Sequence, residues 1–312
     1  MVNDQVVHKE SQKCATVIVT YFPDENTLSY LGNLPKHCRD VYVVDNTPVP
    51  HMESFPDDEN LHVERLNQNQ GLSKAFNKGI ELAASQGHRN IFMFDQDTRI
   101  PPSYFDNMLQ FKNAMGGCNS NCALCVPNFL DRNSGTFAKY PIISRYSVRH
   151  RTCDNLESES PEDALIAITS GTLIDYEMYR QIGPFRDDYF IDFIDNEYCL
   201  RVYRRGFRIA VNCDVTIDHA IGQRENRRFL SLSIKPNHHH PVRRYYIARN
   251  GVRTALEYFK PYPSYAVLIL ARFVHEILSI LLYERKVAKK LKFFSIGVRD
   301  GIAGRMGAFV DR

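Results

Sequence analysis

The segment Ile91-Phe-Met-Phe-Asp-Gln-Asp-Thr-Arg99 joins four apolar residues directly to two acidic residues that stand one residue apart. A short apolar run bounded by polar residues predicts a buried β-strand, so both carboxylates would lie at its carboxyl end. A buried carboxylate without a partner loses much of its solvation free energy. The pair therefore predicts a cation, an arginine or water beside it.

Three interpretations of the pair Asp95 and Asp97 are open on this segment alone. A divalent metal with oxygen ligands would suit a nucleotide diphosphate. An aspartyl phosphatase nucleophile has the signature Asp-x-Asp-x-Thr, but here Thr98 follows Asp97 directly and Arg99 takes the threonine's place, which argues against it. A solvated acidic turn is the third interpretation. The neighbouring segments must decide.

The first third of the chain alternates strand and helix patterns. Apolar, β-branched runs predict strands at 15–20, 41–44, 61–66 and 91–94, and helical spacing predicts helices at 26–34 and 72–85. This alternation predicts an α/β fold of the Rossmann-like kind, with a mainly parallel sheet and helices on both faces.

Polar residues follow three of these strands at their carboxyl ends, where open α/β sheets bind ligands. They are Thr20-Tyr21, Asp45-Asn46 and Asp95-Gln96-Asp97. Farther along, a strand predicted at 168–174 is interrupted by Ser170-Gly171, where small side chains let a ligand approach. The convergence favours a binding site over an isolated acidic turn.

The loop "NQNQGLSKAFNKG", residues 67–79, places Gly71 where the chain enters a helix. Backbone N–H groups and the helix dipole could face an anion there. The glycine spacing matches neither the P-loop nor the dinucleotide fingerprint, so an ordinary helix N-terminus is the alternative.

A second acidic group, Asp192, Asp195 and Glu197, precedes a helix predicted at 197–205. One acid at a helix start is explained by the helix dipole. The helix dipole does not explain three acids interleaved with phenylalanine and isoleucine. A carboxylate in such partly apolar surroundings would have the basicity that a general base needs.

Composition and charge indicate where such a protein works. Hydrophobic content of 44% and charged content of 24% in 312 residues are typical of a globular protein. The polar tail 1–13 resembles neither a secretory signal nor a transit peptide, so we expect a cytoplasmic protein. Residues 220–312 carry 18 Lys and Arg against 6 Asp and Glu, a formal +12, which leaves −9 for residues 1–219 and a total of +3.

The basic C-terminal part could meet an anionic surface, with membrane lipid and nucleic acid as candidates, or it could be a solvated helix face. The apolar run 265–283 contains a narrow polar stripe that argues against a membrane span and favours a buried or interfacial helix. The stripe consists of Arg272, His275, Glu276 and Ser279, and Lys286, Lys289, Lys290 and Lys292 follow it.

One cysteine cluster deserves a test. Cys118, Cys122 and Cys125 have spacing that could hold an iron–sulfur cluster. Cys122 and Cys125 flank an apolar run that predicts a buried strand, so we interpret these thiols as small apolar side chains.

Taken in order, the motifs resemble the family-2 inverting glycosyltransferases of GT-A fold, and among them bacterial rhamnosyltransferases. The resemblance covers roughly residues 14–255 and leaves 1–13 as a tail and 256–312 as a C-terminal extension of basic amphipathic helices. It rests on "VIVTYFPD", "VVDN", "NQGLSKAFNKGI", "FDQDT", "SGTLI", "GPFRDDYFIDFIDNEYCLRVYRRGF", "DHAIG" and "RRYYIARN".

The resemblance implies roles for individual residues. Substrate and nucleotide contacts fall on Thr20, Tyr21, Asp45, Asn46, Gly71, Ala75, Asn77, Asp95, Gln96, Ser170, Gly171, Arg224 and Arg243. A Mg²⁺ or Mn²⁺ ion would face Asp97 and Asp95, with His219 as a further ligand. The family's Glu-Asp pair is Ile194-Asp195 here, so the base is sought among Asp195, Glu197 and Asp192, and Asp195 is favoured.

The implied reaction moves L-rhamnose from dTDP-L-rhamnose to a glycan or lipid-linked saccharide at the anionic inner face of the plasma membrane. Nucleic acid is not an expected partner, and a homo-oligomer stays open. A sugar nucleotidyltransferase would want a glycine-rich basic loop after the first strand, and 20–24 lacks one. A non-catalytic binding module would not need Asp95, Asp97 and Asp195 together.

Overall fold

The computed structural model describes residues 14–38, 40–49, 54–117, 120–132, 135–155, 163–219, 227–229, 232–234 and 236–310. The chain divides into two compact units whose segments interleave along the sequence. Unit 1 comprises Met1–Phe129, Ile168–Asp187 and Arg201–Asp218, and unit 2 comprises Leu130–Ala167, Asp188–Leu200 and His219–Arg312. The predicted tail 1–13 and the side chains of Arg224 and His219 lie outside the described residues.

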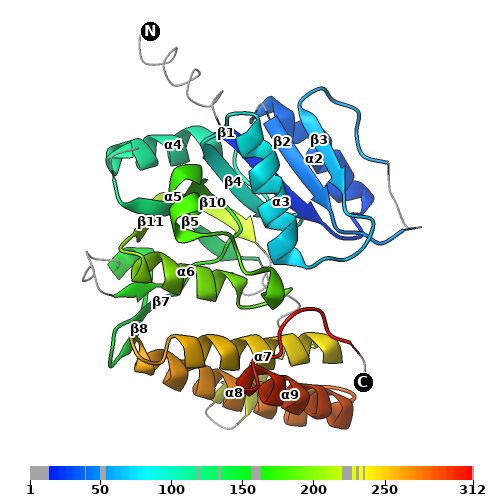
Figure 1. Cartoon of the computed structure of the whole chain (residues 1–312), viewed down its shortest axis with the longest axis vertical. Coiled ribbons are helices and arrows are strands. Elements are labelled where there is room, and N and C mark those ends of the chain that lie inside the picture. The colour runs from blue at the N-terminus through cyan, green and yellow to red at the C-terminus, as the bar shows by residue number, and fades with distance from the viewer. Residues whose placement is uncertain are drawn as a thin grey trace. The chain divides into compact units, whose positions relative to one another are not determined.

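The central sheet has the strand order β11-β5-β10-β4-β1-β2-β3 (Figure 1). Strand β6 pairs with β5 off this path. Strand β1 is parallel to β2 and β4, and β2 is parallel to β3. Strand β10 is antiparallel to both β4 and β5. The strands are β1 Cys14–Thr20, β2 Asp40–Asp45, β3 Leu61–Arg65, β4 Asn90–Asp95, β5 Cys122–Asp131, β6 Thr136–Phe137, β10 Thr172–Asp175 and β11 Arg208–His219.

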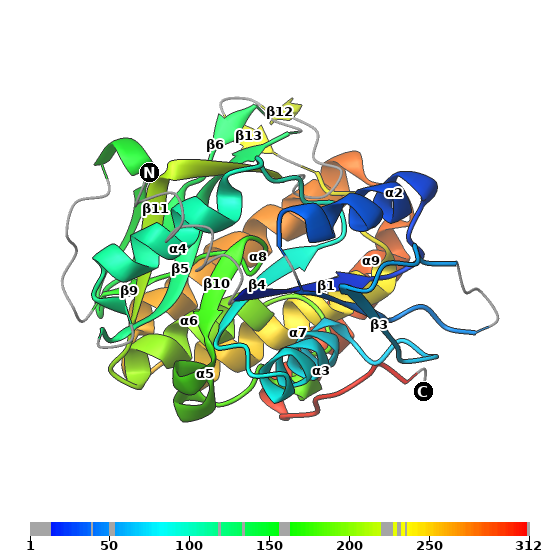
Figure 2. The same ribbon diagram turned by 90° about the horizontal axis from the view of Figure 1, so that it is seen from above.

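Helices cover both faces of the part of this sheet that belongs to unit 1, as predicted. Helices α2 (Glu25–Asn33) and α4 (Tyr104–Ala114) lie on one face, and α3 (Leu72–Ser85) and α5 (Tyr176–Ile182) lie on the other (Figure 2). Gly79 lets α3 approach closely, because a Cβ atom there would lie 2.3 Å from the Val17 side chain. The fold is therefore the expected α/β class.

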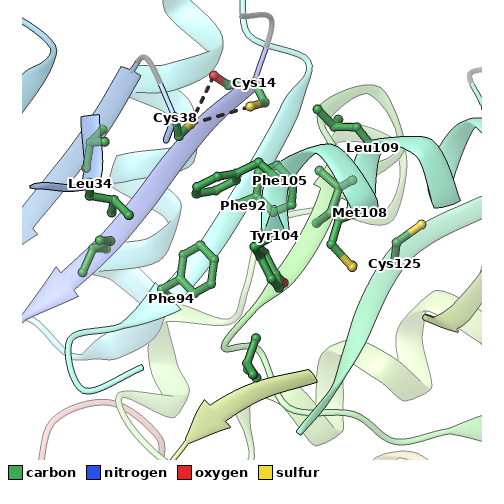
Figure 3. Close-up of a cluster of buried hydrophobic side chains, with 14 of the residues drawn as sticks. Cys14, Leu34, Cys38, Phe92, Phe94, Tyr104, Phe105, Met108, Leu109 and Cys125 are labelled. Carbon is green, nitrogen blue, oxygen red and sulfur yellow. Dashed lines mark hydrogen bonds between the residues drawn. The ribbon is translucent and has the colours of Figure 1, made fainter. Parts of the chain in front are cut away.

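The core beneath α2 and α4 is rich in aromatic side chains (Figure 3). Phe92 and Phe105 pack edge to face with ring centroids 4.9 Å apart, and Phe94 and Tyr104 do so at 5.5 Å. Such geometry adds to the hydrophobic stabilisation of the contact. This core supports β4, the strand that carries the acidic pair.

Two of the three cysteines whose spacing could hold an iron–sulfur cluster lie in the central sheet. Cys122 and Cys125 are buried on β5 with their sulfur atoms 3.8 Å apart, and Cys118 lies outside the described residues. Burial of this kind fits the interpretation of these thiols as small apolar side chains.

Unit 2 contains a three-stranded sheet of order β8-β7-β9, a hairpin of β12 and β13, and long helices. The strands are β7 Tyr140–Ile143, β8 Val148–Arg151, β9 Ala164–Leu165, β12 Arg227–Phe229 and β13 Leu232–Ile234. The helices are α6 Ile194–Arg204, which ends in unit 1, α7 Pro241–Glu257, α8 Pro263–Tyr283 and α9 Val287–Ile302. Short 3-10 turns occupy Leu34–Lys36, Cys153–Asn155 and Asp187–Tyr189.

Helices α7, α8 and α9 lie together in unit 2 (Figure 1). Helix α9 crosses α7 closely, because Cβ atoms at Gly297 and Gly301 would lie 2.3 and 2.5 Å from the backbone oxygens of Tyr245 and Arg249. Within the described residues, α8 is long and apolar enough to cross a membrane by length and composition, with a mean hydropathy of 1.9.

Candidate functional site

The carboxylate of Asp45 organises the edge of the sheet in unit 1. It is 1% exposed, and its Oδ1 accepts hydrogen bonds from Thr20 Oγ1 (3.1 Å), Thr47 Oγ1 (2.7 Å) and Thr47 N–H (3.2 Å). The Arg65 guanidinium lies 3.5 Å from Oδ2. The two predicted residues Thr20 and Asp45 therefore lie together, and Thr47 joins them although the sequence analysis did not select it.

The loop that leads into α3 is held by side-chain amides. Asn46 Nδ2 donates to Asn69 Oδ1 (3.2 Å), and the Gln70 N–H donates to Asn46 Oδ1 (2.8 Å). The Gly71 N–H donates to Asn69 Oδ1 (3.0 Å), and the backbone at Gly71 has φ +90°. Asn46 and Gly71 are thus brought to one network beside Asp45, and Asn69 is the member that the sequence analysis missed.

An aromatic pair stands at the end of β1. Tyr21 and Phe22 are 45% and 47% exposed, and their rings meet edge to face with centroids 4.6 Å apart. The Tyr21 N–H donates to Gln96 Oε1 (2.8 Å), and Gln96 Nε2 donates to the Tyr21 carbonyl (3.2 Å). Exposed aromatic faces held in this way can stack on a nucleobase. Phe22 was a missed candidate, and its signal was an aromatic residue in the turn after a strand.

The acidic pair lies on the turn that follows β4. Asp95 is half-buried and Asp97 is exposed. The Asp95 N–H donates to Ser170 Oγ (3.0 Å), and Ser170 Oγ lies 2.6 Å from the hydroxyl of the buried Thr98. The turn and the Ser170 segment therefore hold each other in place.

Gly171 meets a steric requirement behind this turn. Its φ is +82°, and a Cβ atom there would lie 2.8 Å from the side chains of Ile217 and Pro127. Its carbonyl accepts a hydrogen bond from the Tyr104 hydroxyl. Ser170 and Gly171 therefore shape the edge, and their predicted contact with a donor remains a prediction.

A metal at Asp95 and Asp97 is chemically reasonable. The described part of the chain contains no group of three His, Cys, Asp or Glu residues arranged to hold an ion. A hard divalent cation that is shared with a diphosphate, however, needs only one or two protein carboxylates. Two carboxylates on an accessible turn match that requirement. Their part in metal binding remains a prediction, as does that of His219.

Ala75 and Asn77 occupy packing positions on α3. The Ala75 methyl group is buried. Asn77 Nδ2 donates to the Phe185 carbonyl and to Asp187 Oδ1, each at 2.7 Å, and Asn77 Oδ1 accepts from the Tyr179 hydroxyl at 2.8 Å. The amide of Asn77 therefore ties α3 to the segment after α5. Contact of either residue with a donor remains a prediction.

In unit 2, the segment before α6 has an unusual backbone. Phe190, Asp192 and Phe193 have φ of +66°, +63° and +63°. The left-handed region costs a non-glycine residue on the order of 1 kcal/mol or more and needs support from its surroundings. The buried Asn250 of α7 supplies that support, because its Nδ2 lies within 2.9 Å of the carbonyl oxygens of Tyr189, Ile191 and Asp192.

The three candidate acids of unit 2 have different surroundings. Asp192 forms a bidentate pair with Arg243, at 3.1 Å from Nε and 3.0 Å from Nη2. Glu197 is only 3% exposed and accepts from the Tyr258 hydroxyl (2.9 Å). Asp195 is half-buried, and its Oδ1 accepts from the Asn196 N–H (2.8 Å). Asp195 therefore combines partial exposure with apolar neighbours.

The thiol of Cys199 lies one helical turn after Asp195. Burial, the largest cause, and the charges of Asp195 and Glu197 together raise the pKa of Cys199 to about 12. The thiol is therefore protonated at neutral pH and is not a nucleophile there.

Comparisons with known proteins found one family match, a curated relative and a solved structure. Residues 40–181, which include Asp45, Gly71, Asp97 and Ser170, match the family Glycosyl transferase family 2. The chain is 30% identical over 295 residues to the dTDP-rhamnosyl transferase RfbF of Shigella flexneri. This alignment covers 93% of the present chain and 96% of RfbF. The crystal structure of S. aureus TarS 1-349 with UDP-GlcNAc shares 14% identity, covers 94% of this chain and 92% of that one, and has a TM-score of 0.48.

The extended similarity to a curated relative establishes the family. The chain belongs to glycosyltransferase family 2 and is a glycosyltransferase. The resemblance inferred from the motifs is therefore confirmed.

Proposed function

We propose that this protein is an inverting rhamnosyltransferase that moves L-rhamnose from dTDP-L-rhamnose to a hydroxyl group of a lipid-linked bacterial surface glycan. The observation that carries the donor assignment is the 30% identity, over nearly the whole chain, to a protein named dTDP-rhamnosyl transferase. The polar sheet edge of unit 1 supports it as a site of suitable chemistry.

In this proposal the edge of unit 1 binds the nucleotide. The exposed rings of Tyr21 and Phe22 would stack on the base, and the network around Asp45 would face the ribose. Asp97 and Asp95 would hold Mg²⁺ or Mn²⁺ at the diphosphate. A divalent cation bound there would supply positive charge to the leaving group.

Asp195 of unit 2 would act as the general base. It would take the proton from the acceptor hydroxyl while that oxygen attacks the anomeric carbon from the face opposite the nucleotide. The C–O bond to the diphosphate breaks in the same displacement, so the configuration inverts and a β-linked donor yields an α-rhamnoside. Partial exposure of Asp195, compared with the buried Glu197, supports this choice.

Arg243 and Arg224 would stabilise the leaving diphosphate. The pairing of Arg243 with Asp192 adds a condition to that role, because the guanidinium must serve both partners or exchange one for the other. Arg224 lies outside the described residues.

A donor screen tests the assignment. We expect dTDP release in the presence of divalent metal from dTDP-L-rhamnose, and little release from UDP- or GDP-sugars. Asp97→Ala is the control for turnover at this site. Preferred turnover of another nucleotide sugar would keep the family and reject the rhamnosyl assignment.

A thermal-shift panel separates the competing classes. Metal-dependent stabilisation by dTDP, but not by nucleoside triphosphates or oligonucleotides, would favour the transferase over a nucleotidyltransferase or a nucleic-acid-binding module. We further propose that the basic C-terminal helices associate with an anionic membrane surface, which their charge supports.

A further inference from the structure

Helix α8 packs against the rest of unit 2 through the buried apolar side chains of Ile269, Phe273 and Ile280 and through a few polar side chains. Glu276 forms an ion pair with the buried Arg244 of α7, and the Ser279 hydroxyl donates to the buried Glu284 (3.3 Å). The opposite side is apolar and accessible. Val267 is 67% exposed, Leu270 64%, Val274 51% and Leu281 51%.

The outward face of α8 differs from that of an ordinary surface helix because it is apolar. Positions 267, 270, 274 and 281 follow the three- and four-residue spacing of one helix face. A helix at a protein–water boundary normally places its polar residues on the solvent side. A contiguous exposed apolar face of this kind marks an interaction surface.

A basic cavity lies at the C-terminal end of the same helix. It has a volume of about 490 Å³, and Tyr283 of α8 lines it together with six groups that are cationic or can become so. These are His238, His239, His240, Arg285, Lys286 and Lys290. The cavity therefore adjoins the exposed apolar face, because its lining residue Tyr283 is two positions after Leu281.

The cavity is built on a buried ionic network. Glu284 Oε2 accepts from Lys290 Nζ (2.5 Å), and Glu284 Oε1 accepts from Arg244. Burial alone would raise the pKa of Glu284, but Lys290 and Arg244 outweigh burial and lower it. The charge of Lys290 is thus largely balanced by Glu284. Arg285 and Lys286 are exposed and add the positive charge of the cavity rim.

We propose that the cavity binds the phosphate of an anionic phospholipid headgroup while the exposed face of α8 lies among the acyl chains. The inference rests on the proposed function at a membrane and identifies the lipid-binding surface. The positive charge of the cavity favours a lipid over a second copy of the chain. A two-fold contact between copies would bring two basic cavities together, and these would repel each other. A soluble phosphate would leave the apolar face exposed to water.

Flotation of the full chain with vesicles tests the proposal. We expect binding to phosphatidylcholine vesicles that contain phosphatidylglycerol, much weaker binding to phosphatidylcholine alone, and weakening by salt. Arg285→Gln with Lys286→Gln should reduce the partition coefficient about 25-fold, at about fivefold for each charge. Leu270→Ser with Val274→Ser should reduce it roughly tenfold or more.

Matched control variants remove charged or apolar side chains that lie outside the proposed lipid-binding surface. Lys36→Gln with Arg180→Gln removes two exposed charges from unit 1, and Met115→Ser removes an exposed apolar side chain from it. Both should bind vesicles within about twofold of the unaltered chain, since neither belongs to the proposed surface. Circular dichroism verifies folding.

Several outcomes would overturn the inference. It fails if the unaltered chain does not float, or if the cavity variant floats as well as the controls. Protection of the cavity by inorganic phosphate without vesicle binding would indicate a soluble-anion site. A dimer that the α8 variant dissociates, without vesicle binding, would assign the face to a second copy. Turnover of dTDP-L-rhamnose in vesicle-free solution reports on the proposed function separately.

Discussion

Lys112 lies in the interior of unit 1, and its removal should destabilise the protein without touching the candidate site. Its Nζ donates to Asp175 Oδ2 (2.7 Å) and to Asn90 Oδ1 (2.6 Å), and the side chains of Lys112 and Asp175 are 4% and 0% exposed. Arg89 Nε donates to the same carboxylate oxygen (2.9 Å). The other oxygen caps α5 by accepting from the Glu177 N–H (3.0 Å).

Lys112→Met keeps much of the side-chain volume and leaves the cap intact, so it isolates the charge. Breaking a buried ion pair from one side costs about 3–5 kcal/mol. Because Arg89 still contacts the carboxylate, we expect the lower end, about 3 kcal/mol. At about 2–4 °C per kcal/mol for domains of this size, the melting temperature should fall by roughly 6–12 °C.

The assay is thermal and urea unfolding, with Lys36→Met as the exposed control. Asp175→Asn with Lys112→Met should recover part of the loss, because the double change removes both buried charges. The pKa of Asp175 gives the pH dependence: burial alone would raise it, but Lys112 and Arg89 lower it. The stabilisation is therefore present at neutral pH and is lost as the pH falls below 3.8 through the depressed value. A loss under about 1 kcal/mol for Lys112→Met would refute the reasoning.

Three further predictions concern the candidate sites. Asp195→Asn should lower single-turnover transfer by about 10²–10⁴-fold while dTDP binding is unchanged; a loss of less than tenfold would remove Asp195 as the base, and Glu197→Gln is the comparison. Asp97→Ala should abolish the metal-dependent part of the dTDP thermal shift but keep the metal-independent part, and an unchanged metal response would place the ion elsewhere. Gly171→Ala should cost about 2 kcal/mol or more in unfolding experiments, because of its φ of +82° and the 2.8 Å approach to Ile217; a neutral result would contradict the packing behind the turn.

Much of unit 1 could be predicted from periodicity because its signals are local. The helix predicted at 72–85 has those bounds, and β4 extends the predicted 91–94 by one residue at each end. The antiparallel direction of β10 had no local signal. It depends on the pairing of Leu173 with Phe92, residues far apart in sequence.

The sequence could place residues at or just after strand ends, such as Asp45 at the end of β2 and Asp97 after β4, although their roles remain predictions. The sequence analysis missed the residues that hold other residues in place, because their role depends on partners that only the fold brings near them. Thr47 acts through Asp45, and Asn250 acts through backbone carbonyls about 60 positions earlier. The polar stripe of α8 was recognised, but only the structure shows that its member Glu276 pairs with the buried Arg244 of α7.

The left-handed backbone at Phe190, Asp192 and Phe193 lowers stability but fixes the chain that leads into α6. Glycine in place of Asp192 would relax the backbone, although it would also remove the ion pair with Arg243. The same relaxation would loosen the chain just before Asp195, the proposed general base. If Asp195 is the base, a variant that gains heat resistance by relaxing this backbone should therefore be a slower catalyst.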